Sequence, residues 1–151
     1  SAAGHCLSAS AERDGMELIA VVLHCASSSD RFDSAKALLN YGFSNYALVM
    51  PDAGELPSVP VTLGKAAAVT PVLADDTPLL IARSLAAGVE SSVTLADSVA
   101  APVEAGQTLG TLTITSGGQT LAERDLVAPE AIGALTWADL FRQLLRSLCM
   151  G

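Results

Sequence analysis

Basic residues are scarce in this chain, and long apolar runs are missing. Only 8 of its 151 residues are Lys or Arg, against 16 Asp and Glu, which gives a formal net charge of -8 and a pI near 4.5. Binding to a nucleic-acid backbone requires clustered cations, so we expect no nucleic-acid partner. No apolar run approaches the roughly 18 residues that a membrane-spanning helix needs. We therefore expect no segment that crosses a bilayer.

Cysteines are too few for a disulfide framework. Cys6, Cys25 and Cys149 are odd in number and widely spaced. A two-residue Asp14-Gly15 hairpin loop would set Cys6 opposite Leu23 and make Cys25 its diagonal neighbour, roughly 7–8 Å away, at or beyond disulfide reach. We expect free thiols.

Metal-ligand spacings are also missing. The same hairpin register opposes His5 and His24, but neither a C-x-x-C nor an H-x-x-x-H spacing supplies further ligands. We interpret the two histidines as a surface pair near the strand ends and expect no metal. Asp75-Asp76 could be a carboxylate pair for acid–base chemistry, although a role in a turn explains it more simply.

Half of the residues are hydrophobic, enough for one modest core or two small ones. Residues 5–25 predict a hairpin, and the apolar run Leu18–Leu23 is typical of a strand that is covered on both faces within a larger sheet. Residues 30–42 predict a helix, with Asp30 as N-cap and Gly42 at its end.

A different architecture follows a proline-rich boundary near residues 47–58. Short strand-like runs alternate with turn residues and show no helical period, which predicts a small antiparallel β-sandwich. The predicted strands are Val59–Leu63, Ala67–Leu73, Leu79–Arg83, Val89–Leu95, Thr108–Thr115 and Gln119–Glu123.

The tail from Thr136 has the pattern of an amphipathic helix, with Thr136 and Asp139 spaced as a capping box. Arg142 and Arg146 lie opposite the apolar arc. Such a helix can pack on its own protein, or it can bind a membrane interface or a partner, and the pattern alone gives self-packing about even weight against the other two. The candidate membrane-binding residues are Trp137, Leu140, Phe141, Leu144, Leu145 and Leu148.

Two sets of residues resemble D-alanyl-D-alanine carboxypeptidases, low-molecular-mass penicillin-binding proteins of the serine peptidase class. The first resembles the end of the penicillin-binding domain and the second the C-terminal β-domain. His24 stands where the family more often has glycine. The stretches that carry the resemblance are Ala3–Leu7, Ser10–Leu23, Arg31–Asp33 and Leu38–Phe43, then Ala101–Leu112 and Leu126–Ala128.

The resemblance implies a mixed fold in three parts. Residues 1–46 would be an α+β remnant (β-hairpin plus helix) of a penicillin-binding transpeptidase-like domain, residues 47–130 an antiparallel all-β sandwich domain, and residues 131–151 an amphipathic helix. The family's K-T-G motif comes directly before the first stretch, so the catalytic residues are expected upstream of Ser1.

The family's catalytic motifs are absent from this chain. Ser34-Ala35-Lys36 and Ser44-Asn45 have the wrong spacing for S-x-x-K and S-x-N, and Gly64-Lys65-Ala66 is not K-T-G. We therefore expect no catalytic residue here and no activity from this chain alone. The parent would be a serine-type carboxypeptidase without metal or organic cofactor, which removes the terminal D-alanine from peptidoglycan stem peptides in cell-wall synthesis.

The resemblance further implies a location on the outer face of the bacterial cytoplasmic membrane, with the tail helix as tether and the β-domain as spacer. The competing hypothesis is a non-catalytic β-sandwich module for binding or spacing at the cell surface. A free-standing module has no need of the apolar strand in residues 5–43, so apolar surface left exposed there favours the carboxypeptidase hypothesis. Such exposure would also promote self-association.

Overall fold

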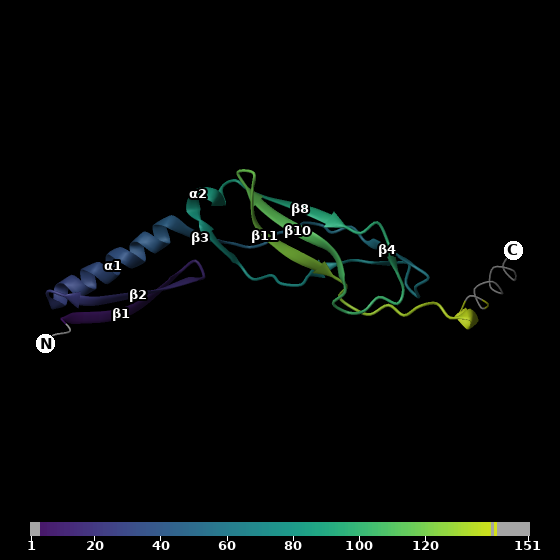
Figure 1. Cartoon of the computed structure of the whole chain (residues 1–151), viewed down its shortest axis with the longest axis horizontal. Coiled ribbons are helices and arrows are strands. Elements are labelled where there is room, and N and C mark those ends of the chain that lie inside the picture. The colour runs from purple at the N-terminus through teal and green to yellow at the C-terminus, as the bar shows by residue number, and fades with distance from the viewer. Residues whose placement is uncertain (1–3, 140, 142–151) are drawn as a thin grey trace. The chain divides into compact units, whose positions relative to one another are not determined.

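The computed structural model describes residues 4–139 and 141, in which strands hold far more residues than helices do. The chain divides into two compact units, each described below by itself. Unit 1 comprises Ser1–Pro51 and Thr77–Val89, and unit 2 comprises Asp52–Asp76 and Glu90–Gly151. Figure 1 labels the elements of both.

Unit 1 begins with the predicted hairpin. Its strands are β1 (His5–Arg13) and β2 (Met16–Cys25), which pair antiparallel. Asp14 and Gly15 connect them with φ of 51° and 76°, the left-handed conformations that a two-residue type I′ turn requires. Arg13 therefore faces Met16, as the sequence predicts.

The predicted register holds from the turn back to Leu7 and fails between Leu7 and His5. His5 pairs with Cys25 and Leu7 with Val22, so one residue of β1 faces two of β2. This bulge places His24 in the left-handed region at φ 59° and removes it from its predicted position opposite His5. Neither Cys6 nor Cys25 is in a disulfide, in line with the prediction, while Cys149 lies outside the described residues.

The bulge gives a testable prediction, because a left-handed φ favours glycine over histidine. Exchanging His24→Gly is expected to stabilise unit 1 by about 1 kcal/mol, measured as slower amide hydrogen exchange in β1 and β2. Gly4→Ala is the opposing control: Gly4 has φ +62°, and an added Cβ would lie 2.8 Å from the His24 Cα. Faster exchange in His24→Gly would contradict the assignment of backbone strain to this residue.

The helix α1 (Ser28–Asn45) is longer than predicted at both ends. Its N-cap is Ser27, whose Oγ accepts from the Asp30 backbone N at 3.1 Å, so Asp30 is in the first turn and is not the cap. Gly42 does not end the helix. It allows close packing instead, since an added Cβ would lie 2.5 Å from the Leu18 Cδ1.

Arg83 completes the end of α1. Its guanidinium donates to the backbone oxygens of Phe43 at 3.0 Å and Tyr46 at 3.3 Å. A cation is favourable at a helix C-terminus, and the last turn of α1 has none of its own. Arg83 begins the short helix α2 (Arg83–Ala86), which follows β7 (Leu79–Ala82), and β7 pairs with β3 (Tyr46–Val49).

This pairing places residues 79–83 in unit 1, whereas the sequence assigned them to the β-domain. Strand pairing with β3 decides their place, and no local pattern in residues 79–83 specifies that partner. The predicted boundaries at residues 46 and 130 otherwise stay predictions.

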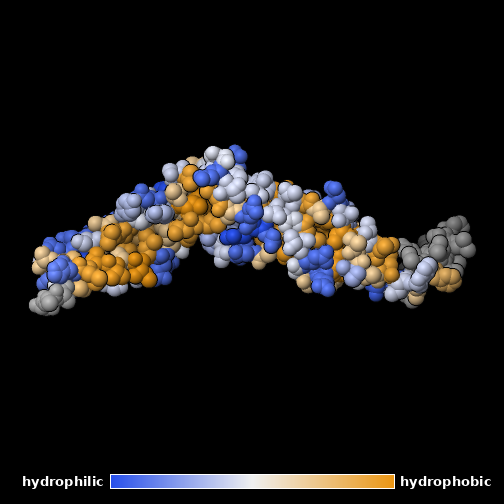
Figure 2. Space-filling model, viewed as in Figure 1, coloured by the Kyte–Doolittle hydropathy of each residue, from blue (hydrophilic) through white to orange (hydrophobic). Residues whose placement is uncertain are grey.

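Only one face of β2 is covered within unit 1. Ala20 and Val22 pack with Ala35 of α1 in a small core. The other face, which the sequence predicts to be buried, leaves large apolar side chains exposed, and Figure 2 shows hydrophobic surface gathered over this hairpin. The exposed fractions are 70% for Ile19, 60% for Val21 and 71% for Leu23.

Unit 2 is a β-sandwich-like domain with two sheets. One has the order β6-β11-β10-β8 and the other β5-β4-β9. The strands are β4 (Val59–Thr62), β5 (Ala68–Val69), β6 (Val72–Leu73), β8 (Val89–Leu95), β9 (Val99–Ala100), β10 (Thr108–Ser116) and β11 (Gln119–Val127).

The core of unit 2 draws side chains from both sheets, which is why the two stack. Val59 and Val61 of β4 meet Leu109 of β10, with Val103 and Ile132 from the connecting segments. Gly110 allows the close approach of β10 to β8, since a Cβ there would lie 2.9 Å from the Leu95 Cα.

Two details differ from the predicted antiparallel sandwich. The pairing of β4 with β9 is parallel. The predicted strand 67–73 is also two short strands in different sheets, separated by the buried Pro71, which has no N–H for a ladder hydrogen bond.

Candidate functional site

The best candidate site is the start of the terminal helix in unit 2. The predicted capping box is present: the Thr136 Oγ1 donates to the Asp139 Oδ2 at 2.7 Å, and the Asp139 backbone N donates to the Thr136 Oγ1 at 3.3 Å. The Thr136 backbone N also donates to the Asp139 Oδ2 at 3.1 Å. These reciprocal bonds fix where the helix begins.

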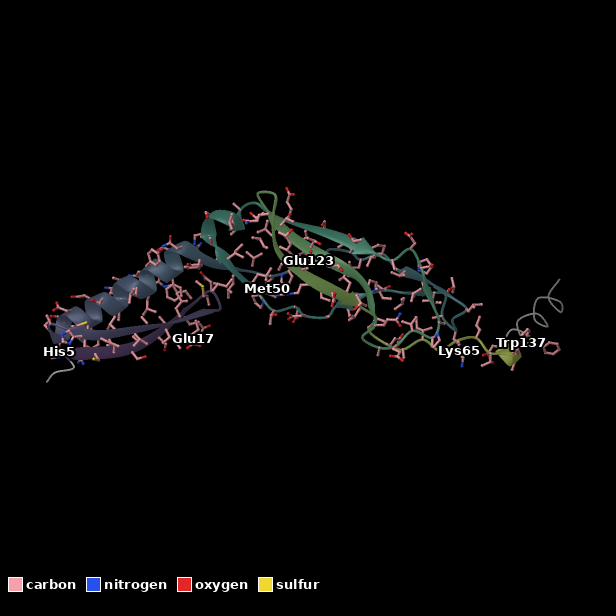
Figure 3. All side chains as sticks on the ribbon, in the orientation of Figure 1. His5, Glu17, Met50, Lys65, Glu123 and Trp137 are labelled. Carbon is pink, nitrogen blue, oxygen red and sulfur yellow. The ribbon has the colours of Figure 1, made fainter. Side chains whose placement is uncertain are left out.

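Two of the candidate membrane-binding residues lie within the described part of the chain, and both are exposed. Trp137 exposes 88% of its surface and Phe141 exposes 65%. Figure 3 shows the Trp137 side chain directed away from the strands of unit 2. The remaining candidates, Leu140, Leu144, Leu145 and Leu148, lie outside the described residues.

Within residues 4–139 and 141, no helix is both long enough and apolar enough to cross a membrane. The interface of a bilayer favours bulky aromatic side chains of the kind that Trp137 and Phe141 expose. Lipid contact by these two residues stays a prediction.

The turn after β4 was predicted, but the sequence reasoning missed its pairing with the segment that leads into the terminal helix. Leu63 follows β4 with φ 58° and 70% of its surface exposed, and its backbone oxygen accepts from the Leu135 backbone N at 2.7 Å. Lys65 lies beside it, and its backbone N donates to the Gly133 oxygen at 2.9 Å. The sequence carries only a weak signal here, a leucine beside glycine at a strand end.

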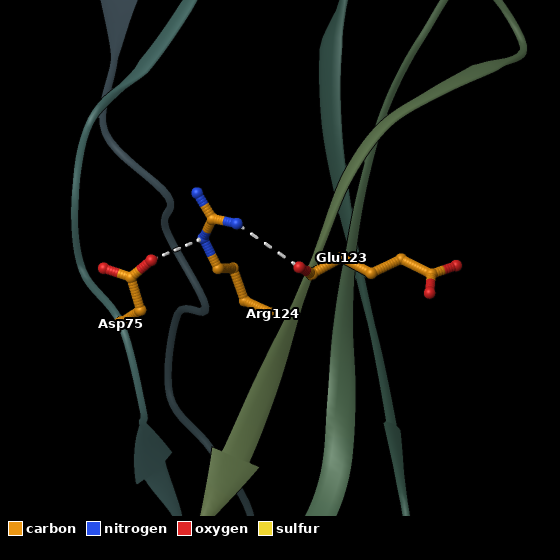
Figure 4. Close-up of polar contacts among 3 residues, drawn as sticks. All are labelled: Asp75, Glu123 and Arg124. Carbon is orange, nitrogen blue, oxygen red and sulfur yellow. Dashed lines mark hydrogen bonds and ion pairs between the residues drawn. The ribbon is translucent and has the colours of Figure 1, made fainter.

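The carboxylate Asp75, a candidate for acid–base chemistry, forms an ion pair in the structure. The Asp75 Oδ2 lies 3.4 Å from the Arg124 Nε, and the Arg124 Nη1 donates to the Glu123 oxygen at 3.5 Å (Figure 4). The ion pair joins the segment after β6 to β11, and the turn role of Asp75 stays a prediction. The Arg124 side chain is 23% exposed and that of Asp75 50%, and a pair near the surface contributes about 0–1 kcal/mol.

Metal-ligating residues do not gather in the part of the chain that the structure covers, where no group of three or more His, Cys, Asp or Glu could hold an ion. The bulge at His24 changes the predicted histidine pairing, because it sets Cys25 opposite His5. His24 is therefore not the register partner that the sequence predicted for His5.

The sandwich-like fold of unit 2 and the helix that begins after it define a small β-domain with a helical tail. The sequence model of the family "Penicillin-binding protein 5, C-terminal domain" matches residues 50–134, more than half of the chain. The chain belongs to this family.

Relatives extend the similarity across most of the chain. D-alanyl-D-alanine carboxypeptidase DacF of Bacillus subtilis (strain 168) is 28% identical over 131 residues, covering 85% of this chain and 34% of the relative. D-alanyl-D-alanine carboxypeptidase DacC of Escherichia coli (strain K12) is 30% identical over 143 residues, covering 86% and 33%.

Solved structures agree. The crystal structure of penicillin binding protein 5 from Haemophilus influenzae has a TM-score of 0.67 and 26% identity, over 87% of this chain and 40% of that one. The resemblance to the C-terminal portion of these carboxypeptidases is confirmed. The chain spans about a third of the length of the curated relatives that it matches.

Proposed function

We propose that the chain is the C-terminal part of a serine-type D-Ala-D-Ala carboxypeptidase that removes the terminal D-alanine from peptidoglycan stem peptides. One observation carries the proposal: the apolar face of β2, with Ile19, Val21 and Leu23 largely exposed, has no cover within unit 1. Burying such side chains is worth about 1.5–3 kcal/mol each, so a strand of this kind belongs inside a larger sheet.

The extent of the structural similarity supports the same proposal. The match to the Haemophilus influenzae protein covers 87% of this chain but only 40% of that one. In this proposal the missing part supplies the rest of the sheet and the catalytic residues. Serine would attack the carbonyl of the D-Ala-D-Ala bond, D-alanine would leave, and water would hydrolyse the acyl-enzyme.

Each part of the chain then has a role. Unit 1 completes the catalytic domain, unit 2 acts as a spacer, and the helix from Thr136 tethers the protein to the outer face of the cytoplasmic membrane. The reaction needs no metal or organic cofactor. On its own, the chain would expose the β2 face and self-associate through it.

The apolar face also distinguishes this function from a free-standing binding or spacer module. β1 and β2 form a sheet of their own. A module with no further domain would gain nothing from exposed Ile19 and Leu23, whereas a domain completed by upstream residues would bury them.

Activity measurements test the proposal. The 151-residue chain is expected to release no D-alanine from a stem pentapeptide above the blank. The product of the complete gene should release it and lose at least about 1000-fold in rate when the serine of its S-x-x-K motif is changed to alanine. Sequencing the coding DNA upstream of Ser1 is the companion measurement. A start codon or signal peptide running directly into Ser1 would contradict the proposal and favour the module.

A further inference from the structure

The turn after β4 is physically joined to the segment that leads into the terminal helix. The backbone of Leu63 accepts from Leu135 at 2.7 Å, and that of Lys65 donates to Gly133 at 2.9 Å. Gly64 forms a bridge with Ala134 between these two bonds. The turn and the residues just before Thr136 therefore form one local structure, and Figure 3 shows Lys65 and Trp137 at the same end of unit 2.

Stability does not explain Leu63. Its φ of 58° is disfavoured for any residue with a Cβ, and its side chain is 70% exposed. The exposed leucine side chain could not be carried by position 64 instead, because a Cβ at Gly64 would lie 2.5 Å from the Val61 Cγ1 and 3.0 Å from the Ala66 oxygen. The turn thus holds a leucine in water at a strained position. Such strain points to function when the residue is also exposed.

The exposed side chains at this end have the chemistry of a lipid interface. Leu63, Trp137 and Phe141 expose 70%, 88% and 65% of their surfaces, and Lys65 is also exposed. Tryptophan and lysine are favoured where acyl chains meet headgroups, because the indole is amphipathic and the lysine stem can lie along apolar surface. The nearby Asp139 carboxylate accepts hydrogen bonds from the Thr136 backbone N and Oγ1 in the capping box.

Charge favours an anionic lipid surface as the occupant. The whole chain carries a formal charge of -8, which an anionic membrane repels, so attraction must come from local cations. Unit 2 has four cations in its sequence, Lys65, Arg124, Arg142 and Arg146, and Arg124 pairs with Asp75. Lys65 is thus placed beside the exposed apolar side chains, where an anionic headgroup would meet it.

We propose that the Leu63–Lys65 turn is a second lipid-contacting element, which inserts Leu63 into the interface of an anionic membrane while Lys65 binds headgroup phosphate. This rests on the proposed tether by the terminal helix and deepens it. The turn and the helix start would bind the membrane together and fix how unit 2 is oriented on it.

Vesicle binding by the full chain tests the turn. On vesicles of equal parts phosphatidylglycerol and phosphatidylcholine, Leu63→Gly should bind about tenfold more weakly (about 1.4 kcal/mol). Its thermal stability should be unchanged or higher, since glycine tolerates the left-handed φ. Lys65→Gln should bind about fivefold more weakly on the same vesicles and match the wild type on phosphatidylcholine alone. The only tryptophan of the chain, Trp137, reports insertion by the blue shift of its fluorescence.

The control is Leu38→Ala on α1, which removes a leucine of 50% exposure from the other unit and should bind like the wild type. If the wild type binds and Leu63→Gly binds equally well, the turn is not a lipid contact, while the helix tether stands. If the wild type binds neither kind of vesicle, both the turn and the tether are wrong. Release of D-alanine by the complete gene product is independent of either outcome.

Discussion

Replacing Trp137 and Phe141 together by alanine is expected to lower the partition of the chain onto phosphatidylglycerol-containing vesicles by about 100-fold, or about 2.7 kcal/mol. The two side chains are 88% and 65% exposed, so they are available to the bilayer without unfolding. Full burial of two aromatic side chains would contribute several kcal/mol at about 25 cal/mol per Å², and an interfacial position realises part of it. Co-flotation with liposomes measures the effect.

A double variant in unit 1 controls for general hydrophobicity. Phe32→Ala with Leu38→Ala removes two side chains of 55% and 50% exposure from α1 and should float like the wild type. Equal recovery of the Trp137→Ala, Phe141→Ala variant in the lipid fraction would remove the tether from the proposed function. The carboxypeptidase assignment of the complete protein would not depend on that result.

The largest stability effect is expected for Leu112→Ala, with a loss of about 2–5 kcal/mol in the unfolding free energy of unit 2. Leu112 lies in the middle of β10 and is 0% exposed, and Ile114 of the same strand and Leu126 of β11 are also almost fully buried. The substitution removes the transfer free energy of the side chain and leaves a cavity that β10 and β11 cannot close. Amide hydrogen exchange of β10 and β11 reports unit 2 separately from unit 1.

Val72→Ala is the matched control, because Val72 lies in the same sheet and is 43% exposed. It should cost less than about 1 kcal/mol. A Leu112→Ala cost as small as that of Val72→Ala would show that Leu112 is not at the centre of the core.

Local chemistry explains which elements could be predicted. Asp14-Gly15 supplies the two left-handed residues of a tight hairpin, so its turn and first pairs follow directly. The strand 89–95 was predicted with its observed bounds, since turn residues flank it on both sides. Thr136 and Asp139 formed the expected capping box because its spacing is a local property.

Features that depend on distant partners were missed. Which strand Leu79–Ala82 pairs with, and the parallel pairing of Val99 with Val61, depend on tertiary contacts. The bulge at His24 shifted the register beyond Leu7, and glycine in the related family was the only sequence signal for its left-handed φ. The helix cap was a local miss: the structure has Ser27 at the N-cap and not the predicted Asp30, and both residue types suit that position.

By itself, the sequence determined the family, the β-rich architecture and the capping box at Thr136, because these follow from local residue types and their spacing. Only the tertiary structure decided that one face of β2 lacks a cover and that Leu63 and Lys65 lie beside the segment leading to Trp137. Burial and juxtaposition are properties of segments far apart in the chain, and a local pattern cannot specify them.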